Sequence, residues 1–516
     1  MVTTTAAEEL APTGASRGIS RRQLIQSPVR RAAAAPGRDA ASRGAASIRL
    51  PATAPAPDPA LHLLRRTSFG VRSDELQEAR QAGPESYLER QLHPASIPDG
   101  QTERLVEQRY PGVFLPVREL FEERNPLTLQ QFIDATVLRP ILSTRQLYEV
   151  MVDFWSNHFS IYLLKGDDAW LKLIDDREVI RANALGSFRD LLYGSAKSPA
   201  MLFYLDNYTN KKDGPNENYA RELLELHTLG VDNGYTQEDV EELARVLTGW
   251  SLGSNVSPRP GEFAFLPGNH DEGDKVVLGQ QILSDGIREG EVVLDMLAAH
   301  PNTAQYLATK LCRRFVADEP PKSIVDAAAQ TFLSTGGDIK SVLRTILLSD
   351  ELFAAPDMKI QRPFEFLVAV MRALDVFPTH AGIAQVEETL ALLGQLPHHR
   401  LDPDGYPDVA EAWVSSDGLL TRWNFVYRLV EQPGQAFPWR LDRLVDGLDQ
   451  PSPAMLTDRL VDRLLHRTID SGDREVMVSY AAQGHPVDAP LAAGEIETVG
   501  RRLVVYILNS PYFQLR

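Results

Sequence analysis

Apolar residues recur at intervals of three and four along most of the chain from Leu61 onward, which is the spacing of one helix face. The pattern predicts helices over 74–92, 127–142, 145–159, 188–193, 291–299, 303–316, 322–332, 339–348, 363–374 and 498–508. Gly336-Gly337-Asp338 separates two of these helices, with Asp338 as the expected N-cap. The body of the chain is therefore expected to be dominated by α-helix.

A single region has the alternation of a β-strand. Residues 262–265 and 275–279 flank the polar, turn-rich stretch 267–274, which predicts one small β-hairpin near 262–283. The sequence shows no regular alternation of strand and helix and no glycine-rich phosphate loop, so a nucleotide-binding α/β fold is not expected. The predicted fold class is all-α, a bundle-like body of many helices with one hairpin.

Composition divides the chain into a short basic segment and a long acidic body. Residues 1–57 are rich in Ala, Arg, Ser and Pro and nearly lack aromatic residues, which predicts disorder. Residues 58–516 are expected to form the helical body, as two packed subdomains dividing near 285–300. The first 57 residues carry a net charge of +5, from eight Arg against Glu8, Glu9 and Asp39. The whole chain has a net charge of −17, so residues 58–516 carry −22.

These charges bear on partners and location. An acidic body repels nucleic acid, so no nucleic-acid partner is expected, and no apolar run approaches the roughly 18 residues of a membrane-spanning segment. Arg21-Arg22 resembles the core of a twin-arginine export signal, which favours the cell envelope. The apolar run that should follow is missing, which favours the cytoplasm and a remnant or chance arginine pair. The single cysteine, Cys312, is expected to be a buried small apolar residue.

Residues 213–250 form the most informative segment, a predicted helix, a short loop and a second helix. In the first helix Asn218, Arg221, Glu222 and Glu225 share one face. This face could be solvated, with an Arg221–Glu225 ion pair, or it could point its two carboxylates into an interior site. The second helix begins with acidic residues, which argues against DNA recognition by a helix–turn–helix motif.

At NENYARELLELHTLGVDNGYTQEDVEELARVLTGW the sequence resembles the hallmark segment of the bacterial domain-of-unknown-function 1800 family. Further resemblance lies in LHLLRRTSFG, FWSNHFSI, NHDEGDKVVLG, QRPFEFLVAVMRAL and GQLPHHRLDPDGYPDVAEAWVS, in chain order over roughly 58–516. The resemblance implies a largely helical bacterial protein of a family with no agreed activity. Many members carry twin-arginine signals and are encoded beside an alkaline-phosphatase-like hydrolase family, which implies a cell-envelope setting and a protein partner from that family. This sequence has Ser156 where many relatives have His.

The family-like segments hold the candidate chemistry. His158, Glu222, His270 and Asp271 suit a divalent metal such as Zn²⁺, Mn²⁺ or Fe²⁺. Glu222 and Glu225, with Arg221 holding one carboxylate ionised, suit general acid–base catalysis. Each residue also has a structural interpretation: His158 as a helix cap, Arg221 as an ion-pair anchor, and His270-Asp271 as a loop.

Two functions follow as hypotheses. The first is a metal- or carboxylate-dependent hydrolase linked to the cell envelope, with these side chains at its centre. The second is a non-catalytic accessory or assembly protein that partners the neighbouring hydrolase family. The first requires the side chains to converge in an accessible pocket, and the second expects them dispersed or paired, with an apolar surface patch elsewhere.

Overall fold

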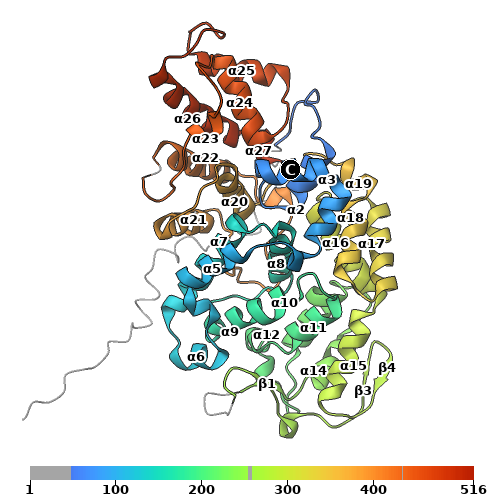
Figure 1. Ribbon diagram of the computed structural model, residues 1–516. Helices are drawn as coiled ribbons and strands as arrows, with labels where there is room; N and C mark the ends of the chain where they lie inside the picture. Colours follow the sequence, from blue (N-terminus) through green and yellow to red (C-terminus); the bar gives the residue numbers. More distant parts are fainter. Residues whose placement is uncertain (1–47, 254–258, 433) are drawn as a thin grey trace, which may run out of the picture. The chain divides into compact units, whose positions relative to one another are not determined.

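The computed structural model describes residues 48–253, 259–432 and 434–516 (Figure 1). The predictions for residues 1–47, including the twin-arginine pair Arg21-Arg22, lie outside the described residues. The end of the predicted disordered segment is described: Leu50 and Ala54 pack against the core, and the Thr53 hydroxyl donates to Asp470 (2.5 Å).

The described residues are predominantly helical, which confirms the predicted fold class. The first helices are α2 (Pro59–Thr67), α3 (Ser73–Ala82), α4 (Pro84–Gln91), α5 (Gly100–Arg109), α6 (Val117–Glu123), α7 (Pro126–Leu142), α8 (Gln146–His158), α9 (Asp168–Asp175), α10 (Arg181–Asn183), α11 (Phe188–Ala196), α12 (Pro199–Tyr204), α13 (Glu217–Glu222) and α14 (Gln237–Val246). After the strands come α15 (Ile287–Ala298), α16 (Pro301–Phe315), α17 (Lys322–Thr335), α18 (Ile339–Leu347), α19 (Asp350–Phe353), α20 (Pro363–Ala373), α21 (His380–Leu392), α22 (Ser416–Glu431), α23 (Asp442–Val445), α24 (Pro453–Leu465), α25 (Ser471–Ala482), α26 (Ala493–Asn509) and α27 (Pro511–Gln514).

Shorter helical turns join these helices. They are η3 (Pro94–Ser96), η4 (Pro111–Phe114), η6 (Asn207–Thr209), η8 (Pro267–Asn269) and η9 (Ala410–Ala412), and the π-helical turns η5 (Asp176–Ile180) and η7 (Leu223–Thr228).

Helix positions follow the predicted spacing closely, with one correction. The helix predicted over 74–92 is two helices, α3 and α4, because Gly83 takes a φ of 81° and Pro84 starts a new helix. Asp338 is the N-cap of α18, where its carboxylate accepts from the amide of Ser341 (2.8 Å). Cys312 is fully buried, as expected.

Strands form in both predicted segments, but they pair differently, and one partner, at 250–252, was not predicted as a strand. The segments predicted as one hairpin belong to two separate antiparallel pairs: β2 (Phe263–Phe265) pairs with β1 (Trp250–Leu252), and β3 (Lys275–Val277) pairs with β4 (Gln280–Ile282). Leu278 and Gly279 both have positive φ, 51° and 74°. Two such residues make the tight turn that favours a local hairpin, which explains why β3 pairs with the strand that follows it.

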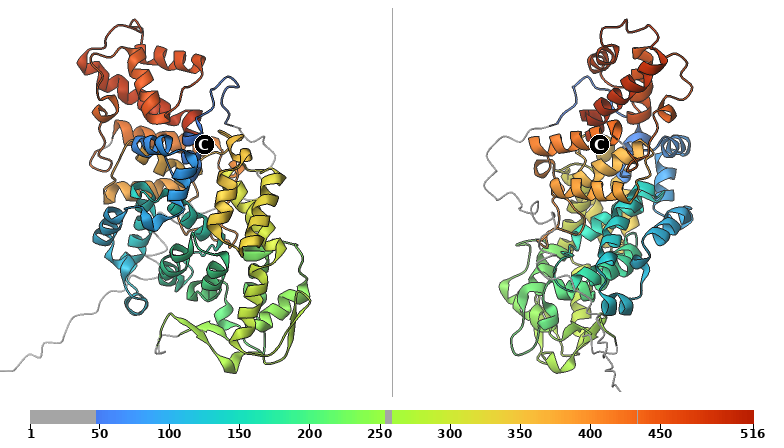
Figure 2. Two further views of the ribbon diagram at one scale, coloured as in Figure 1. Left: turned by 45° about the vertical axis from the view of Figure 1, so that its right-hand side comes forward. Right: turned by 90° about the vertical axis from the view of Figure 1, so that its left-hand side faces the viewer.

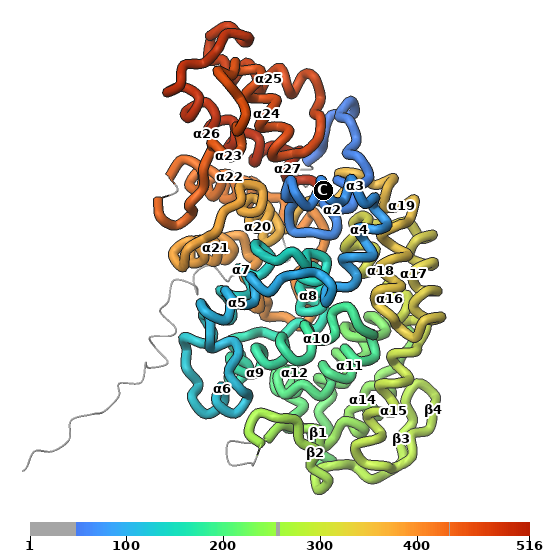
Figure 3. The backbone as a smooth tube through the Cα atoms, viewed as in Figure 1, coloured from blue at the N-terminus to red at the C-terminus, as the bar shows by residue number. Residues whose placement is uncertain are grey.

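The C-terminus docks against the first helix of the body. The Arg65 side chain of α2 donates to the carbonyls of Tyr512 (2.5 Å) and Leu515 (2.6 Å). Ile360, just before α20, forms a β-bridge with Leu515. In both views of Figure 2 the C-terminal segment reaches this junction, and Figure 3 shows α16, α17 and α18 packed side by side. Within the described ranges, no helix combines the length and the apolar character needed to cross a membrane.

Helices α7 and α21 meet at a pair of carboxyl groups, of which Asp134 is buried and Glu387 half-buried. Gln130 Nε2 donates to Asp134 (2.7 Å) and to Glu387 (2.7 Å), and His380 lies 4.0 Å from Asp134. Burial, together with the hydrogen bond and charge of Asp134, raises the pKa of Glu387 to about 8. The folded protein therefore binds a proton here that the unfolded chain releases near pH 4.5, so the pair's contribution to stability falls as the pH rises from about 4.5 to about 8.

Replacing Glu387 with glutamine is expected to raise the melting temperature at pH 9, by about 2 °C or more, because the glutamine carries no charge beside Asp134 and has no proton to lose. At pH 5 the variant and the wild type should melt within about 1 °C of each other. Glu388→Gln, at the exposed neighbouring position, is the control and should show no such pH dependence. A Glu387→Gln effect of equal size at both pH values would contradict the shared-proton account.

Candidate functional site

The hallmark segment folds into α13, the π-helical turn η7 and α14. The first helix predicted within 213–250 is α-helical only in its first half, and its second half, Leu223–Thr228, is π-helical. The wider turn of a π-helix is a frequent feature of functional sites. Thr236 and Asp239 form a capping box at the start of α14.

Arg221, Glu222 and Glu225 lie together on this segment. The Arg221 guanidinium lies 3.6 Å from the carboxylate of Glu225 and 2.9 Å from that of Glu217. Glu222 has no ion pair among the described residues, and burial, followed by the charge of Glu225, raises its pKa. The side chains of Glu222 and Glu225 are both partly accessible to solvent. Two neighbouring carboxyl groups thus differ in environment: one favours its proton, and the other faces a cation.

His158 lies behind this segment in the core. Its Nε2 is 3.1 Å from the carbonyl oxygen of His227, so Nε2 carries the proton, and Nδ1 accepts from Lys310 Nζ (2.9 Å). Burial, then the charge of Lys310, holds the pKa of His158 well below its usual value. Burial also lowers the pKa of Lys310 to about 8.

Sequence reasoning missed Lys310. Its signal is visible in α16, where Tyr306, Lys310 and Arg313 share a face at helical spacing. The interpretation of His158 as a residue that binds a carbonyl oxygen fits its contact with His227. The histidine was expected to contact a metal or a carbonyl, and the lysine contact was not foreseen.

A loop from 400 to 406 lies close to α8, to Glu222 and to Lys310. Asn157 holds it with two hydrogen bonds to the backbone of Tyr406, one accepted from the amide (2.7 Å) and one donated to the carbonyl (2.9 Å). Within the loop, Arg400 and Asp404 form an ion pair (3.0 Å). The charge of Asp404 further raises the pKa of Glu222 and opposes the lowering of the pKa of Lys310.

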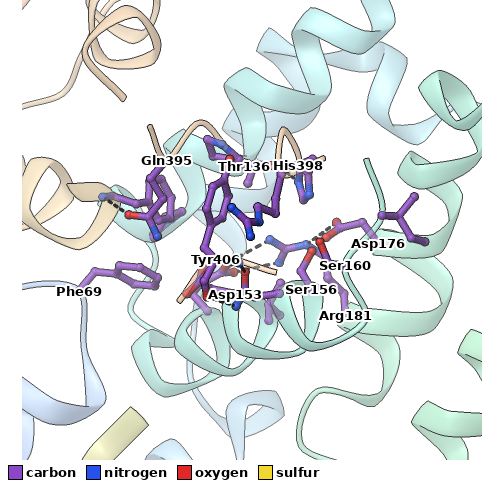
Figure 4. A pocket seen from close by; sticks show the side chains of 18 residues that line it. Phe69, Thr136, Asp153, Ser156, Ser160, Asp176, Arg181, Gln395, His398 and Tyr406 are labelled. Carbon is purple, nitrogen blue, oxygen red and sulfur yellow. Dashed lines mark hydrogen bonds and ion pairs between the residues drawn. The ribbon is translucent and has the colours of Figure 1, made fainter. Parts of the chain in front are cut away.

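The same loop closes a cavity of about 60 Å³ (Figure 4). Side chains from α8, the segment after α9, α20 and the chain from 395 to 406 line it. Arg181 lies at its wall and donates to Glu149 (3.0 Å) and Asp176 (3.0 Å). Ser156 Oγ is buried and has no hydrogen-bond partner within the described residues. The cavity wall is therefore mainly apolar, with the ion pairs of Arg181 on one side and a position for one more hydrogen bond at Ser156.

His270 and Asp271 belong to a different network. His270 Nε2 lies 2.9 Å from Glu289, and Lys275 Nζ lies 2.5 Å from the same carboxylate. Asp271 pairs with Arg245 (2.9 Å). Because every one of these charged groups has a partner, the network ties α14, the 270–275 loop and α15 together.

The four predicted metal ligands, His158, Glu222, His270 and Asp271, do not form one site. Across the residues that the structure describes, no group of three or more His, Cys, Asp or Glu side chains is arranged to hold a metal ion. His158 bonds to Lys310 and the His227 carbonyl, while His270 and Asp271 are occupied by Glu289 and Arg245. The placement of four ligands together, expected from the sequence, is therefore corrected: helix α8 and the 270–271 loop direct these side chains to separate networks.

The family model described as "Protein of unknown function (DUF1800)" matches residues 62–515, nearly the whole described chain. The chain belongs to the DUF1800 family. No curated protein and no solved structure matches it. In this DUF1800 protein the cavity brings together four of the segments that carry the family resemblance: Phe69 comes from LHLLRRTSFG, Ser156 from FWSNHFSI, Phe364 from QRPFEFL, and His398 from LPHHRLDPDG.

Proposed function

We propose that this DUF1800 protein is a carboxylate-dependent hydrolase, with Glu222 as general acid and Glu225 as general base. The observation that carries the proposal is the unequal environment of the two carboxyl groups. Glu222 favours its proton through burial and the charge of Glu225, whereas Glu225 faces Arg221. Two adjacent carboxyls whose environments differ in this way are typical of acid–base catalysis.

In the proposed reaction Glu225 takes a proton from water as the water attacks the substrate. Glu222 gives its proton to the leaving oxygen as the scissile bond breaks, so charge and protons balance. Arg221 lies 3.6 Å from the carboxylate of Glu225 and acts as a positioning residue. The 400–406 loop would hold the polar part of the substrate beside Glu222, since its Asp404 acts electrostatically on that carboxyl group. Arg400 and Tyr406 of the same loop line the cavity, to which Glu222 and Glu225 do not contribute.

The carboxylate form of the hypothesis is preferred to the metal form on the contacts of the histidines. His270 and Asp271 hydrogen-bond to Glu289 and Arg245, so using them as ligands would require a buried network to open. The proposed setting is the bacterial cell envelope, with a polymer of the envelope as substrate. Support for the setting comes from the resemblance and from Arg21-Arg22, which lies outside the described residues.

The test is a panel of chromogenic glycosides, carboxylic esters and phosphate esters, assayed across pH. The wild type is expected to hydrolyse one class, with activity falling as the pH rises through the raised pKa of Glu222, because the acid must be protonated. Glu222→Gln should lower kcat by about 100-fold or more, the usual contribution of general acid catalysis.

Glu217→Gln is the matched control, since Glu217 also pairs with Arg221 but lies one turn before it and is more exposed than Glu225 (40% against 20%). It should leave kcat within about twofold, as expected for an exposed ion pair. Retained activity in Glu222→Gln, or an equal loss in Glu217→Gln, would contradict the assignment of the acid.

A second function, an accessory protein for the neighbouring hydrolase family, is favoured by one surface. Leu420, Trp423 and Tyr427 lie one turn apart on α22 and are 54%, 44% and 49% exposed. An apolar stripe of this kind is a common mark of a docking surface. Photo-crosslinking from position 423, with exposed position 127 as control, distinguishes a specific partner from adventitious contacts.

A further inference from the structure

Four arginines are buried where α2, α16, α20 and α22 meet the C-terminus, and two of them contact Glu365. Arg66, Arg314, Arg422 and Arg516 are at most 2% exposed, and we refer to them as the arginine cluster. Glu365, at the start of α20, is 1% exposed. Arginine is rarely buried to this degree unless each charge is paired.

Pairing within the arginine cluster is incomplete. Arg314 and Arg516 both contact Glu365, the latter at 3.0 Å. Arg362 shares the same carboxylate (3.2 Å) and has Asp153 as well (2.6 Å). Arg66 and Arg422 have no ion pair within the described residues; their hydrogen bonds go to the Ala355 carbonyl and the Gln514 amide oxygen.

The other carboxylates near the arginine cluster form ion pairs with residues outside it. Asp357 pairs with Arg65 (3.0 Å) and Arg467 (2.8 Å). Lys359 lies 2.5 Å from Asp318 and 3.0 Å from Asp408. The arginine cluster is therefore left with Glu365 as its one carboxylate within ion-pair distance in the described residues.

Several guanidinium nitrogen atoms of the arginine cluster also lack hydrogen-bond partners among the described residues. They are Nε and Nη1 of Arg66, Nε and Nη2 of Arg314, Nε and Nη2 of Arg422, and Nε of Arg516. A buried donor without an acceptor is costly, and more so when it is charged. Burial lowers the pKa of both Arg422 and Arg516 to about 10, because an apolar environment disfavours the charged form.

A cavity of about 30 Å³ adjoins the arginine cluster. Arg516, Arg65, Glu365, Gln361 and Ser68 contribute to its wall. The Gln361 amide oxygen is buried there without a partner. By volume the cavity holds about two or three water molecules, which is the size of one small oxyanion.

We propose that this cavity binds a small tetrahedral oxyanion, phosphate or sulfate, against Arg516 and in the field of Arg66 and Arg314. Glu365 also lines the cavity, but three guanidinium groups surround that carboxylate and offset its charge. Planar guanidinium groups suit oxyanions because they offer paired donors. The bound anion ties α2 and α20 to the C-terminal segment, independently of the carboxylates of the proposed active site.

The cluster also draws on family-like segments. Arg66 lies in LHLLRRTSFG, and Glu365 lies in QRPFEFL. These two segments are about 300 residues apart in sequence, and the Arg66 side chain lies within electrostatic range of Arg314 and Arg516. The site is thus built by the folded chain and not by one local motif.

The test is equilibrium dialysis of the full chain against radiolabelled phosphate, with and without excess sulfate, at constant ionic strength. The wild type is expected to bind one equivalent, displaced by sulfate if the site accepts any tetrahedral oxyanion and retained if it selects phosphate. Arg516→Met should lose this binding. Arg372→Met, a buried arginine paired with Glu75, is the control and should retain it.

Melting temperatures in phosphate and in chloride provide a second readout. Phosphate stabilises proteins in general, so only the difference between variants counts: the increment should be smaller in Arg516→Met than in Arg372→Met. If Arg516→Met fails to fold, Arg66→Met replaces it in both measurements. Less than a fifth of an equivalent bound by the wild type, or equal binding by all folded variants, would overturn the proposal.

Discussion

Replacing Glu289 with alanine is expected to destabilise the protein by about 3 to 5 kcal/mol, the usual cost of removing one partner from a buried ion pair. Glu289 is 1% exposed and bonds to both His270 (2.9 Å) and Lys275 (2.5 Å). Its loss leaves the Lys275 ammonium buried with only the carbonyl of Asp271 and a more distant carboxylate, 4.0 Å away. Urea unfolding monitored by circular dichroism measures the effect.

Glu291→Ala is the matched control, two residues further along α15. Glu291 pairs with Lys197 (2.5 Å), but about a third of its side chain is exposed. Its loss should cost no more than about 1 kcal/mol, as for other surface ion pairs. Equal destabilisation by the two substitutions would contradict the assignment of His270 to a buried structural network.

Replacing Gly405 with alanine is expected to cost about 2 kcal/mol or more and to release the 400–406 loop, because steric overlap adds to backbone strain. Gly405 has a φ of +75°, and a Cβ there would lie under 3.0 Å from the backbone oxygen of Asn157. The two hydrogen bonds between Asn157 and Tyr406 would then break. Hydrogen exchange of the peptide containing the loop should become faster.

Gly394→Ala separates strain from overlap, since Gly394 also has a φ of +75° but has no atom within 4 Å of the added Cβ. It carries the conformational cost alone, about 1 kcal/mol, and should leave exchange of the 400–406 loop unchanged. If both substitutions accelerate exchange in that loop equally, contact with Asn157 is not what holds it.

The spacing of apolar residues was sufficient to predict the positions of most of the helices named in the sequence analysis. The helices over 127–142 and 303–316 lie within two residues of their expected bounds, because apolar periodicity and terminal prolines act locally. Strand pairing was not predictable in the same way. Residues 275–277 pair forward with 280–282 through the Leu278-Gly279 turn, and 263–265 pair back with 250–252, a partner outside the expected hairpin.

The candidate site was predictable only where its residues share one helix. Arg221 and Glu225 lie four residues apart, and their ion pair follows from that spacing. The contact of His158 with Lys310 joins residues 152 apart, and that of Asn157 with Tyr406 joins residues 249 apart. No local pattern specifies such pairs, so the predicted meeting of His158 with His270 had no physical basis beyond their residue types.

The central claim is that Glu222 keeps its proton beyond the pH at which an ordinary glutamate loses it. Carbon-13 NMR of protein labelled at the glutamate carboxyl carbon measures this directly, with the Glu222 resonance assigned by its disappearance in Glu222→Gln. The account predicts a titration above the ordinary value of 4.5, which moves down when Glu225→Gln removes the neighbouring charge. A Glu222 resonance that titrates at or below 4.5, unaffected by Glu225→Gln, would contradict the account.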